Sequence, residues 1–174
     1  MEQSSGFEKL PTESDYQDLK SKLLNDELSF EEIRKRLFEF DQAVPTRDAA
    51  DENLKFLYDP EVAHYVHAHP EAIKEYKDIL GFTEFHVAQR LAVDGSMEAM
   101  EHFRKSLENA DPADDEGWAA YVEGSLLYME GKEIPEEIIE KAGKRGERNK
   151  DILRNFNAGL RVRGAISYLE DYSK

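Results

Sequence analysis

The chain has 174 residues, no cysteine and a formal net charge of −15 at pH 7. The lack of cysteine excludes disulfides, thiol catalysis and thiolate metal sites, and the negative charge disfavours nucleic acids and anionic membranes as partners. No stretch is apolar over the roughly 18 residues of a membrane span, and residues 1–6 lack the basic and apolar regions of a secretory signal. We therefore expect a cytoplasmic protein with no membrane association.

In chain order, the polar residues 1–12 predict a flexible N-terminal lead-in, and residues 13–174 predict a single all-helical domain. Within it, residues 13–81 are expected to form irregular helical hairpins and residues 82–174 more regular ones. Apolar residues recur at helical spacing, and short connections between amphipathic helices favour antiparallel neighbours. The six prolines fall between these segments or at their starts, where helices tolerate them: Pro11, Pro45, Pro60, Pro70, Pro112 and Pro135.

Two helix starts in the first half follow from local chemistry. Ser29 and Glu32 have the spacing of a capping box. Asp59 and Pro60 suit the N-cap and first position of the next helix. Gly81 is expected to separate one helix from the following one. The first half therefore predicts several short helices.

Three glycines in the second half suggest an internal period. Gly95, Gly131 and Gly164 each lie at a predicted bend, so the bends recur at nearly equal intervals along the chain. A unit of two helices and a turn that repeats about every 34 residues is typical of tetratricopeptide arrays. Residues 98–108, followed by Asp111 and Pro112, resemble the second helix of that repeat and its closing turn.

The spacing of Leu153, Phe156, Leu160 and Gly164 is similar to the first-helix signature of the same family. The resemblance covers residues 82–174 and implies a right-handed α-solenoid; a compact helical array is the alternative. In the tetratricopeptide family, the concave surface of such an array binds peptide segments of other proteins. The resemblance therefore implies a non-enzymatic binding module, and we expect no cofactor.

A basic segment interrupts the acidic chain. Residues 141–163 contain eight lysines and arginines against two acidic residues, a net charge of +6. Helical spacing places four polar side chains of this segment on one face: Lys150, Arg154, Asn157 and Arg161. Guanidinium groups in a row suit carboxylates or phosphates, so this face is a candidate site for an acidic peptide or another anion.

Two other interpretations of the basic segment remain open. The segment can pair with acidic side chains of its own fold, because the rest of the chain carries most of the carboxylates. It can also meet the acidic surface of a second copy, which would make the chain a self-associating structural protein and a homodimer. Both interpretations leave the identity of any protein partner unknown.

The histidines His64, His67 and His69 form a second cluster. His64 and His67 are three positions apart on a predicted helix and could face one metal ion, which would need further ligands. This spacing supports an alternative function as a metal-binding protein or an enzyme. The simpler interpretation is a set of histidines near a helix C-terminus, where positive charge is favourable.

Overall fold

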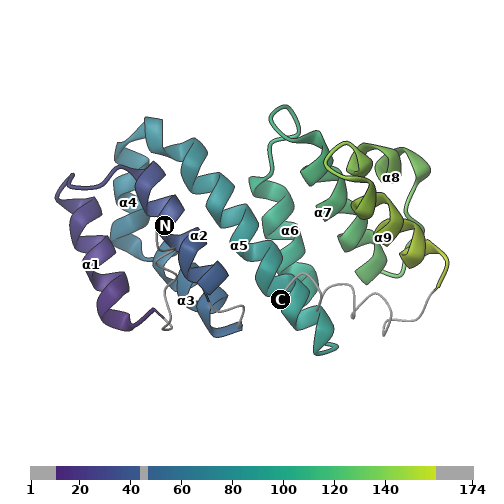
Figure 1. Cartoon of the computed structure of the whole chain (residues 1–174), viewed down its shortest axis with the longest axis horizontal. Coiled ribbons are helices and arrows are strands. Elements are labelled where there is room, and N and C mark those ends of the chain that lie inside the picture. Colours follow the sequence, from purple (N-terminus) through teal and green to yellow (C-terminus); the bar gives the residue numbers. More distant parts are fainter. Residues whose placement is uncertain (1–10, 44–46, 160–174) are drawn as a thin grey trace, which may run out of the picture. The chain divides into compact units, whose positions relative to one another are not determined.

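The computed structural model describes residues 11–43 and 47–159, and all regular secondary structure in these ranges is helical. The prediction of an all-helical chain is confirmed for them. The elements of the described ranges (Figure 1) are nine α-helices and one short 3-10 helix, η1: α1 Glu13–Leu24, α2 Phe30–Ala43, α3 Arg47–Leu57, α4 Pro60–Ala68, η1 Pro70–Ala72, α5 Ile73–Val93, α6 Ala99–Asn109, α7 Glu116–Met129, α8 Glu136–Gly143 and α9 Glu147–Asn157.

The chain divides into two compact units between Leu80 and Gly81, a point inside α5. The first unit holds α1–α4, η1 and the start of α5, and the second holds the rest of α5 and α6–α9. The expected single domain over residues 13–174 stays a prediction. Most of the expected lead-in, residues 1–10, lies outside the described residues.

Local capping chemistry sets the helix starts of the first unit. Ser29 and Glu32 form the predicted capping box, in which the Glu32 carboxylate accepts a hydrogen bond from the Ser29 backbone N–H at 2.8 Å. The Asp59 side chain accepts from the backbone N–H of Glu61 and precedes Pro60, as predicted. These caps satisfy backbone donors that the first helical turn leaves without partners.

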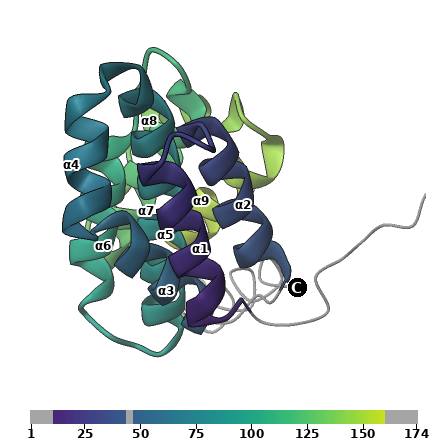
Figure 2. The same cartoon turned by 90° about the vertical axis from the view of Figure 1, so that its left-hand side faces the viewer.

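Aromatic rings fill the core of the first unit. Tyr16 on α1 packs edge to face against Phe40 on α2, with ring centroids 5.2 Å apart. Its hydroxyl donates to Asn53 Oδ1 on α3 at 2.7 Å, and the Asn53 amide donates to the Leu37 carbonyl at 2.9 Å. Asn53 is fully buried, so these bonds satisfy a polar group that would otherwise be costly. In Figures 1 and 2, α2 lies beside α1.

The expected helix break at Gly81 is wrong, because α5 runs through this residue from Ile73 to Val93. The glycine instead permits a close crossing of α5 and α6. Ser106 donates its hydroxyl to the Gly81 carbonyl at 2.7 Å. A Cβ atom at position 81 would lie 3.3 Å from the Cβ of Asn109, which is tighter than ordinary packing allows.

In the second unit, α6 packs on α7, and α7, α8 and α9 contact one another. The turns after α5 and α7 have the same geometry. Gly95 and Gly131 have φ of 75° and 70°, and the residue after each donates to a carbonyl five positions earlier. This is the Schellman ending, which needs a residue with positive φ and so favours glycine. It reverses the chain at the two described bends.

The third predicted bend, Gly164, lies outside the described residues. The helix α9 ends before it, at Asn157, and is followed by Gly159 with φ of 62°. No helix in the described part of the chain combines the length and the apolar character that a bilayer crossing needs.

Candidate functional site

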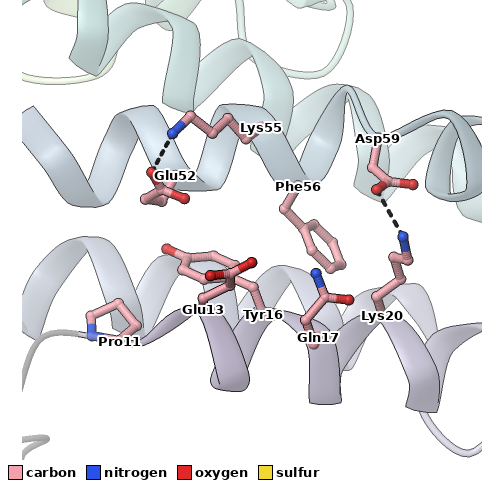
Figure 3. Close-up of a pocket in the computed structure, with 9 residues that line it drawn as sticks. All are labelled: Pro11, Glu13, Tyr16, Gln17, Lys20, Glu52, Lys55, Phe56 and Asp59. Atoms are coloured by element: carbon pink, nitrogen blue, oxygen red, sulfur yellow. Dashed lines mark hydrogen bonds and ion pairs between the residues drawn. The ribbon is translucent and has the colours of Figure 1, made fainter.

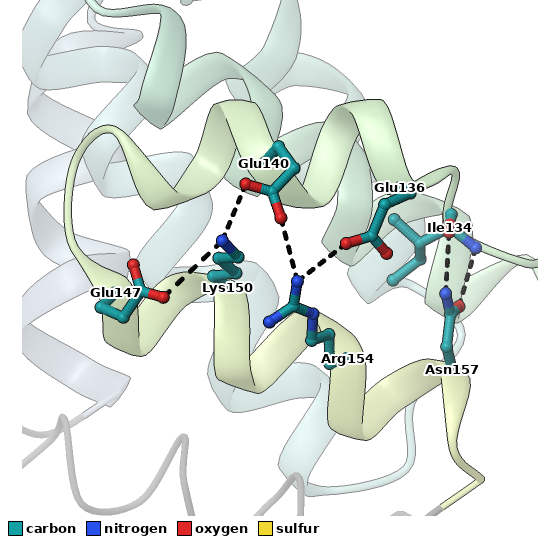
Figure 4. A network of polar contacts seen from close by, with 7 residues as sticks. All are labelled: Ile134, Glu136, Glu140, Glu147, Lys150, Arg154 and Asn157. Carbon is teal, nitrogen blue, oxygen red and sulfur yellow. Dashed lines mark hydrogen bonds and ion pairs between the residues drawn. The ribbon is translucent and has the colours of Figure 1, made fainter.

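The candidate basic face lies on α9 and meets a row of glutamates on α8 (Figure 4). Arg154 donates from Nη2 to Glu136 Oε1 at 2.8 Å and to Glu140 Oε1 at 2.9 Å. Lys150 donates to the other Glu140 oxygen at 2.7 Å. The hydrogen bond from Lys150, together with its charge, lowers the pKa of the Glu140 carboxyl. Both cations are thus neutralised inside the α8–α9 hairpin.

Asn157, the third member of the predicted face, binds backbone. Its Oδ1 accepts from the Ile134 N–H at 2.8 Å, and its Nδ2 donates to the Ile134 carbonyl at 2.7 Å (Figure 4). The paired bonds hold the connection between α7 and α8 against the end of α9. Ile134 itself is 2% exposed, so its backbone needs such partners.

Arg161, the fourth member, lies outside the described residues. The three described members share one face, as the helical spacing predicts, but their polar groups already bind within the hairpin and its preceding connection. This arrangement matches the alternative in which the segment pairs with its own fold. The assignment of Lys150, Arg154, Asn157 and Arg161 to anion binding stays a prediction.

The basic turn before α9 is also paired within the second unit. Arg145 donates to Asp115 at 2.5 Å, and its guanidinium lies 4.9 Å from the centre of the Trp118 ring. Lys144 donates to Glu116, also at 2.5 Å. Gly117 lets this turn approach α7, because a Cβ there would lie 2.8 Å from the Arg145 backbone nitrogen. The turn therefore covers the N-terminal end of α7.

The histidine cluster does not form a metal site in the described structure. Among residues 11–43 and 47–159, no three histidine or acidic side chains gather as metal ligands. His69 Nδ1 contacts the Tyr65 carbonyl at 2.8 Å, and its ring stacks on Tyr65 with centroids 3.9 Å apart. His64 and His67 are exposed on α4. The position of His69 at the end of α4 fits the simpler interpretation of a helix-terminal histidine.

A buried glutamate in the second unit contacts a part-buried histidine, and the sequence pattern does not predict this contact. Glu84 on α5 is completely buried, and one of its oxygens lies 2.5 Å from His102 Nδ1 on α6. A carboxylate removed from water needs such a donor. The two residues are 18 positions apart on different helices, so helical spacing alone gives no signal for their contact.

The first unit carries a groove between α1 and α3. This α1–α3 groove has a volume of about 530 Å³ (Figure 3). Aromatic rings of Tyr16 and Phe56 form its floor, with centroids 6.3 Å apart. Its complete lining is Pro11, Glu13, Tyr16, Gln17, Lys20, Glu52, Lys55, Phe56 and Asp59.

Two ion pairs flank the floor of the groove. Lys55 donates to Glu52 at 2.5 Å on α3, with both side chains well exposed. Lys20 reaches from α1 to Asp59 at 2.9 Å (Figure 3). It also reaches Glu61 at 2.6 Å. The second pair closes one end of the groove, whereas the first lies within a single helix and leaves the rim accessible.

Burial and nearby carboxylates act on the Tyr16 hydroxyl at the floor of the groove. Burial, followed by the carboxylates of Glu52, Asp41 and Asp15, raises the pKa of the Tyr16 hydroxyl above its ordinary value of 10.0. The sequence pattern indicates Tyr16 only as a core residue, because it lies on an apolar helical stripe. The groove also depends on Phe56, which lies on a different helix, so spacing along the chain does not predict it.

No protein-family model matches the chain, and neither the curated proteins nor the solved structures contain a significantly similar one.

Proposed function

We propose that the chain is a non-enzymatic module that binds a protein or a peptide segment of one. The observation that supports this most is the recurrence of one turn in the second unit. Gly95 and Gly131 follow the ends of α5 and α7 with similar positive φ and the same hydrogen-bond pattern. Repeated helical hairpins bury their apolar faces only against neighbours, and stacking exposes an extended binding surface.

The proposal includes a tetratricopeptide-like arrangement of residues 82–174. Two features support it: the recurrence of the glycine turn, and the sequential packing of α6 on α7 and of α7 on α8. In such an array each hairpin contacts mainly its neighbours. The role that we propose is that of an adaptor or regulator, whose specificity comes from surface side chains.

Within this proposal, the Lys150–Arg154 face stabilises the hairpin instead of capturing a partner. An acidic peptide could reach Arg154 only by displacing Glu136 and Glu140, which bind it at 2.8 and 2.9 Å. The displaced carboxylates of Glu136 and Glu140 would stay beside the incoming carboxylate, and their repulsion opposes binding. Substitution of Arg154 should therefore change stability more than partner capture.

Affinity capture with the whole chain from an extract of its native cells tests the proposed function. We expect a reproducible partner that also forms a stoichiometric complex with the chain after separate purification. The Arg154→Glu variant serves as a control and should retain the partner. Absence of any reconstituted complex, or sedimentation of the chain only as a salt-sensitive homo-oligomer, would contradict the proposal.

A further inference from the structure

The α1–α3 groove belongs to the first unit, which does not contain the hairpins that support the proposed function. It combines aromatic rings at its floor with a charged rim of three carboxylates and two ammonium groups. The helices α1 and α3 are bridged there by the hydrogen bond from Tyr16 to Asn53. The bond holds the ring of Tyr16 in place, so the floor is preorganised for an incoming group.

Carboxylates outnumber cations at the open end of the groove. Glu13 is exposed, and Glu52 binds Lys55 three positions further along α3. The hydrogen bond and charge of Glu52, with smaller contributions from Asp51 and Glu13, raise the pKa of Lys55. At this end the lining therefore holds one ammonium group, that of Lys55, and two carboxylates, those of Glu13 and Glu52. The net charge of −15 adds a long-range attraction for positively charged partners.

The floor suits the hydrocarbon stem of a basic side chain. Phe56 points from α3 toward α1, and it lines the groove together with Tyr16 and Pro11 (Figure 3). Lysine and arginine pack their methylene groups on apolar surfaces and keep the charge at the rim. A cation over an aromatic face gains further electrostatic attraction. An acidic side chain would instead meet the negative potential produced by Glu52 and Glu13.

Resting on the proposed binding function, we infer that the α1–α3 groove receives a basic peptide segment of a partner protein. An arginine or lysine of that segment packs its stem on Pro11 and on the small exposed parts of the Phe56 and Tyr16 rings, which are 5% and 7% exposed. Its charged group binds Glu13 and shares the Glu52 carboxylate with Lys55. The Lys20–Asp59 pair limits the groove at its other end, so the contact spans only a short segment.

The test is fluorescence anisotropy of a short labelled peptide in which leucine and alanine alternate with arginine and lysine. The matched peptide has glutamate at every basic position. We expect saturable binding of the basic peptide to the whole chain and none of the acidic one. Affinity should fall as salt rises, because the rim contacts are exposed to solvent.

Paired charge reversals locate the site. Glu13→Lys with Glu52→Lys should lower the affinity for the basic peptide at least about tenfold. The matched control, Glu98→Lys with Glu133→Lys, changes the net charge equally at exposed positions of the second unit and should lower it less than about threefold. An equal loss in both pairs would show only a general charge effect and would overturn the inference.

A gain of affinity provides a test that does not depend on a disruptive change. Lys55→Gln removes the cation that competes for Glu52 and should raise the affinity for the basic peptide about threefold. Circular dichroism should show the same helical content in all variants. Unchanged affinity in a folded Lys55→Gln variant would count against the groove.

Other results would show that the groove does not bind a basic peptide specifically. Equal binding of the acidic peptide, or a homodimer that Glu13→Lys and Glu52→Lys dissociate, overturns the inference. If the chain captures a partner but does not bind the basic peptide, the inference is overturned and the proposed function stands. If the whole chain captures no partner, both the inference about the groove and the proposed function are overturned.

Discussion

Glycine is distributed unevenly between the two units. Residues 1–80 contain a single glycine, Gly6, and all the others lie in residues 81–174. In the second unit some of them permit close helix packing. A Cβ at Gly124 would lie 2.8 Å from Leu153, and one at Gly117 would lie 2.8 Å from the Arg145 backbone. The backbone contact at Gly117 leaves no room for a side chain, and Leu153 would have to shift to admit one at Gly124.

The first unit packs its helices without glycine, because residues 11–80 contain none, whereas aromatic pairs occur in both units. Tyr16 contacts both Phe40 and Phe56, and Phe30 packs on Tyr76 with centroids 5.7 Å apart. Bulky side chains fill the core but leave the α1–α3 groove open at the surface. The difference indicates closer helix packing at these glycines of the second unit, whereas the surface of the first unit carries the α1–α3 groove.

The largest expected effect concerns the contact between Glu84 and His102 in the second unit. His102→Leu leaves the Glu84 carboxylate without this donor and should lower the free energy of unfolding by about 3 kcal/mol. Urea unfolding measures the change. His102→Asn places an amide nitrogen near the position of Nδ1 and should recover much of the loss. Equal losses in both variants would show that steric fit, not the hydrogen bond, matters there.

A glycine substitution tests the close packing itself. Gly117→Ala places a Cβ against the Arg145 backbone and should cost about 2 kcal/mol after any gain in helix propensity. Gly146→Ala is the control, since nothing lies within 4 Å of its added Cβ. A stability of Gly117→Ala equal to that of the control would contradict the close packing at this glycine.

In the first unit, Tyr16→Phe removes the donor to the buried Asn53 side chain. We expect a loss of about 1 kcal/mol, measured by thermal or urea unfolding. The effect should be confined to the first unit. Hydrogen exchange would then show faster opening of α1 and α3, with α7 and α8 unchanged.

Ionisation of Tyr16 should make the stability of the folded chain depend on pH in the alkaline range. Its pKa is raised in the folded chain, chiefly by burial, so the unfolded chain ionises first. The stabilisation is complete below the ordinary pKa of 10.0 and is lost as the pH rises above it. The Tyr16→Phe variant should lose less stability between pH 9 and pH 11, both values being about one unit from the ordinary pKa. Parallel curves for the two proteins would contradict this origin.

The smallest effect is expected at the ion pairs of the α8–α9 hairpin. Arg154→Gln removes two exposed contacts and should lower the free energy of unfolding only slightly, and less so at high salt. Asn157→Ala is a useful comparison, because it removes both hydrogen bonds to the Ile134 backbone and should cost more in the same urea titration. If Arg154→Gln cost more than Asn157→Ala, the ion pairs would contribute more to the stability of the hairpin than the Asn157 hydrogen bonds.

Local sequence chemistry predicts the helix starts well, but it predicts the tertiary contacts poorly. Ser29 and Asp59 act on backbone groups two or three positions away, so their spacing is enough to predict the caps. Gly81 shows the limit. A glycine can end a helix or allow a close crossing, and only the partner Ser106, 25 positions away, distinguishes the two.

The same limit applies to the candidate sites. Helical periodicity places Lys150, Arg154 and Asn157 on one face, but their partners lie on or before a neighbouring helix, 10 to 23 positions away. Whether a basic stripe is free or neutralised therefore depends on how α8 and α9 pack. The α1–α3 groove likewise requires Tyr16 and Phe56 to meet from two separate helices, and each alone looks like a core position.

Backbone amide chemical-shift mapping of the whole chain with the basic peptide tests the central comparison most directly. We expect the largest shifts in residues 11–20 and 52–59, which line the α1–α3 groove, and little change in α7–α9. Saturation with perturbations concentrated on residues 147–157, or no saturable perturbation in the first unit, would contradict the account.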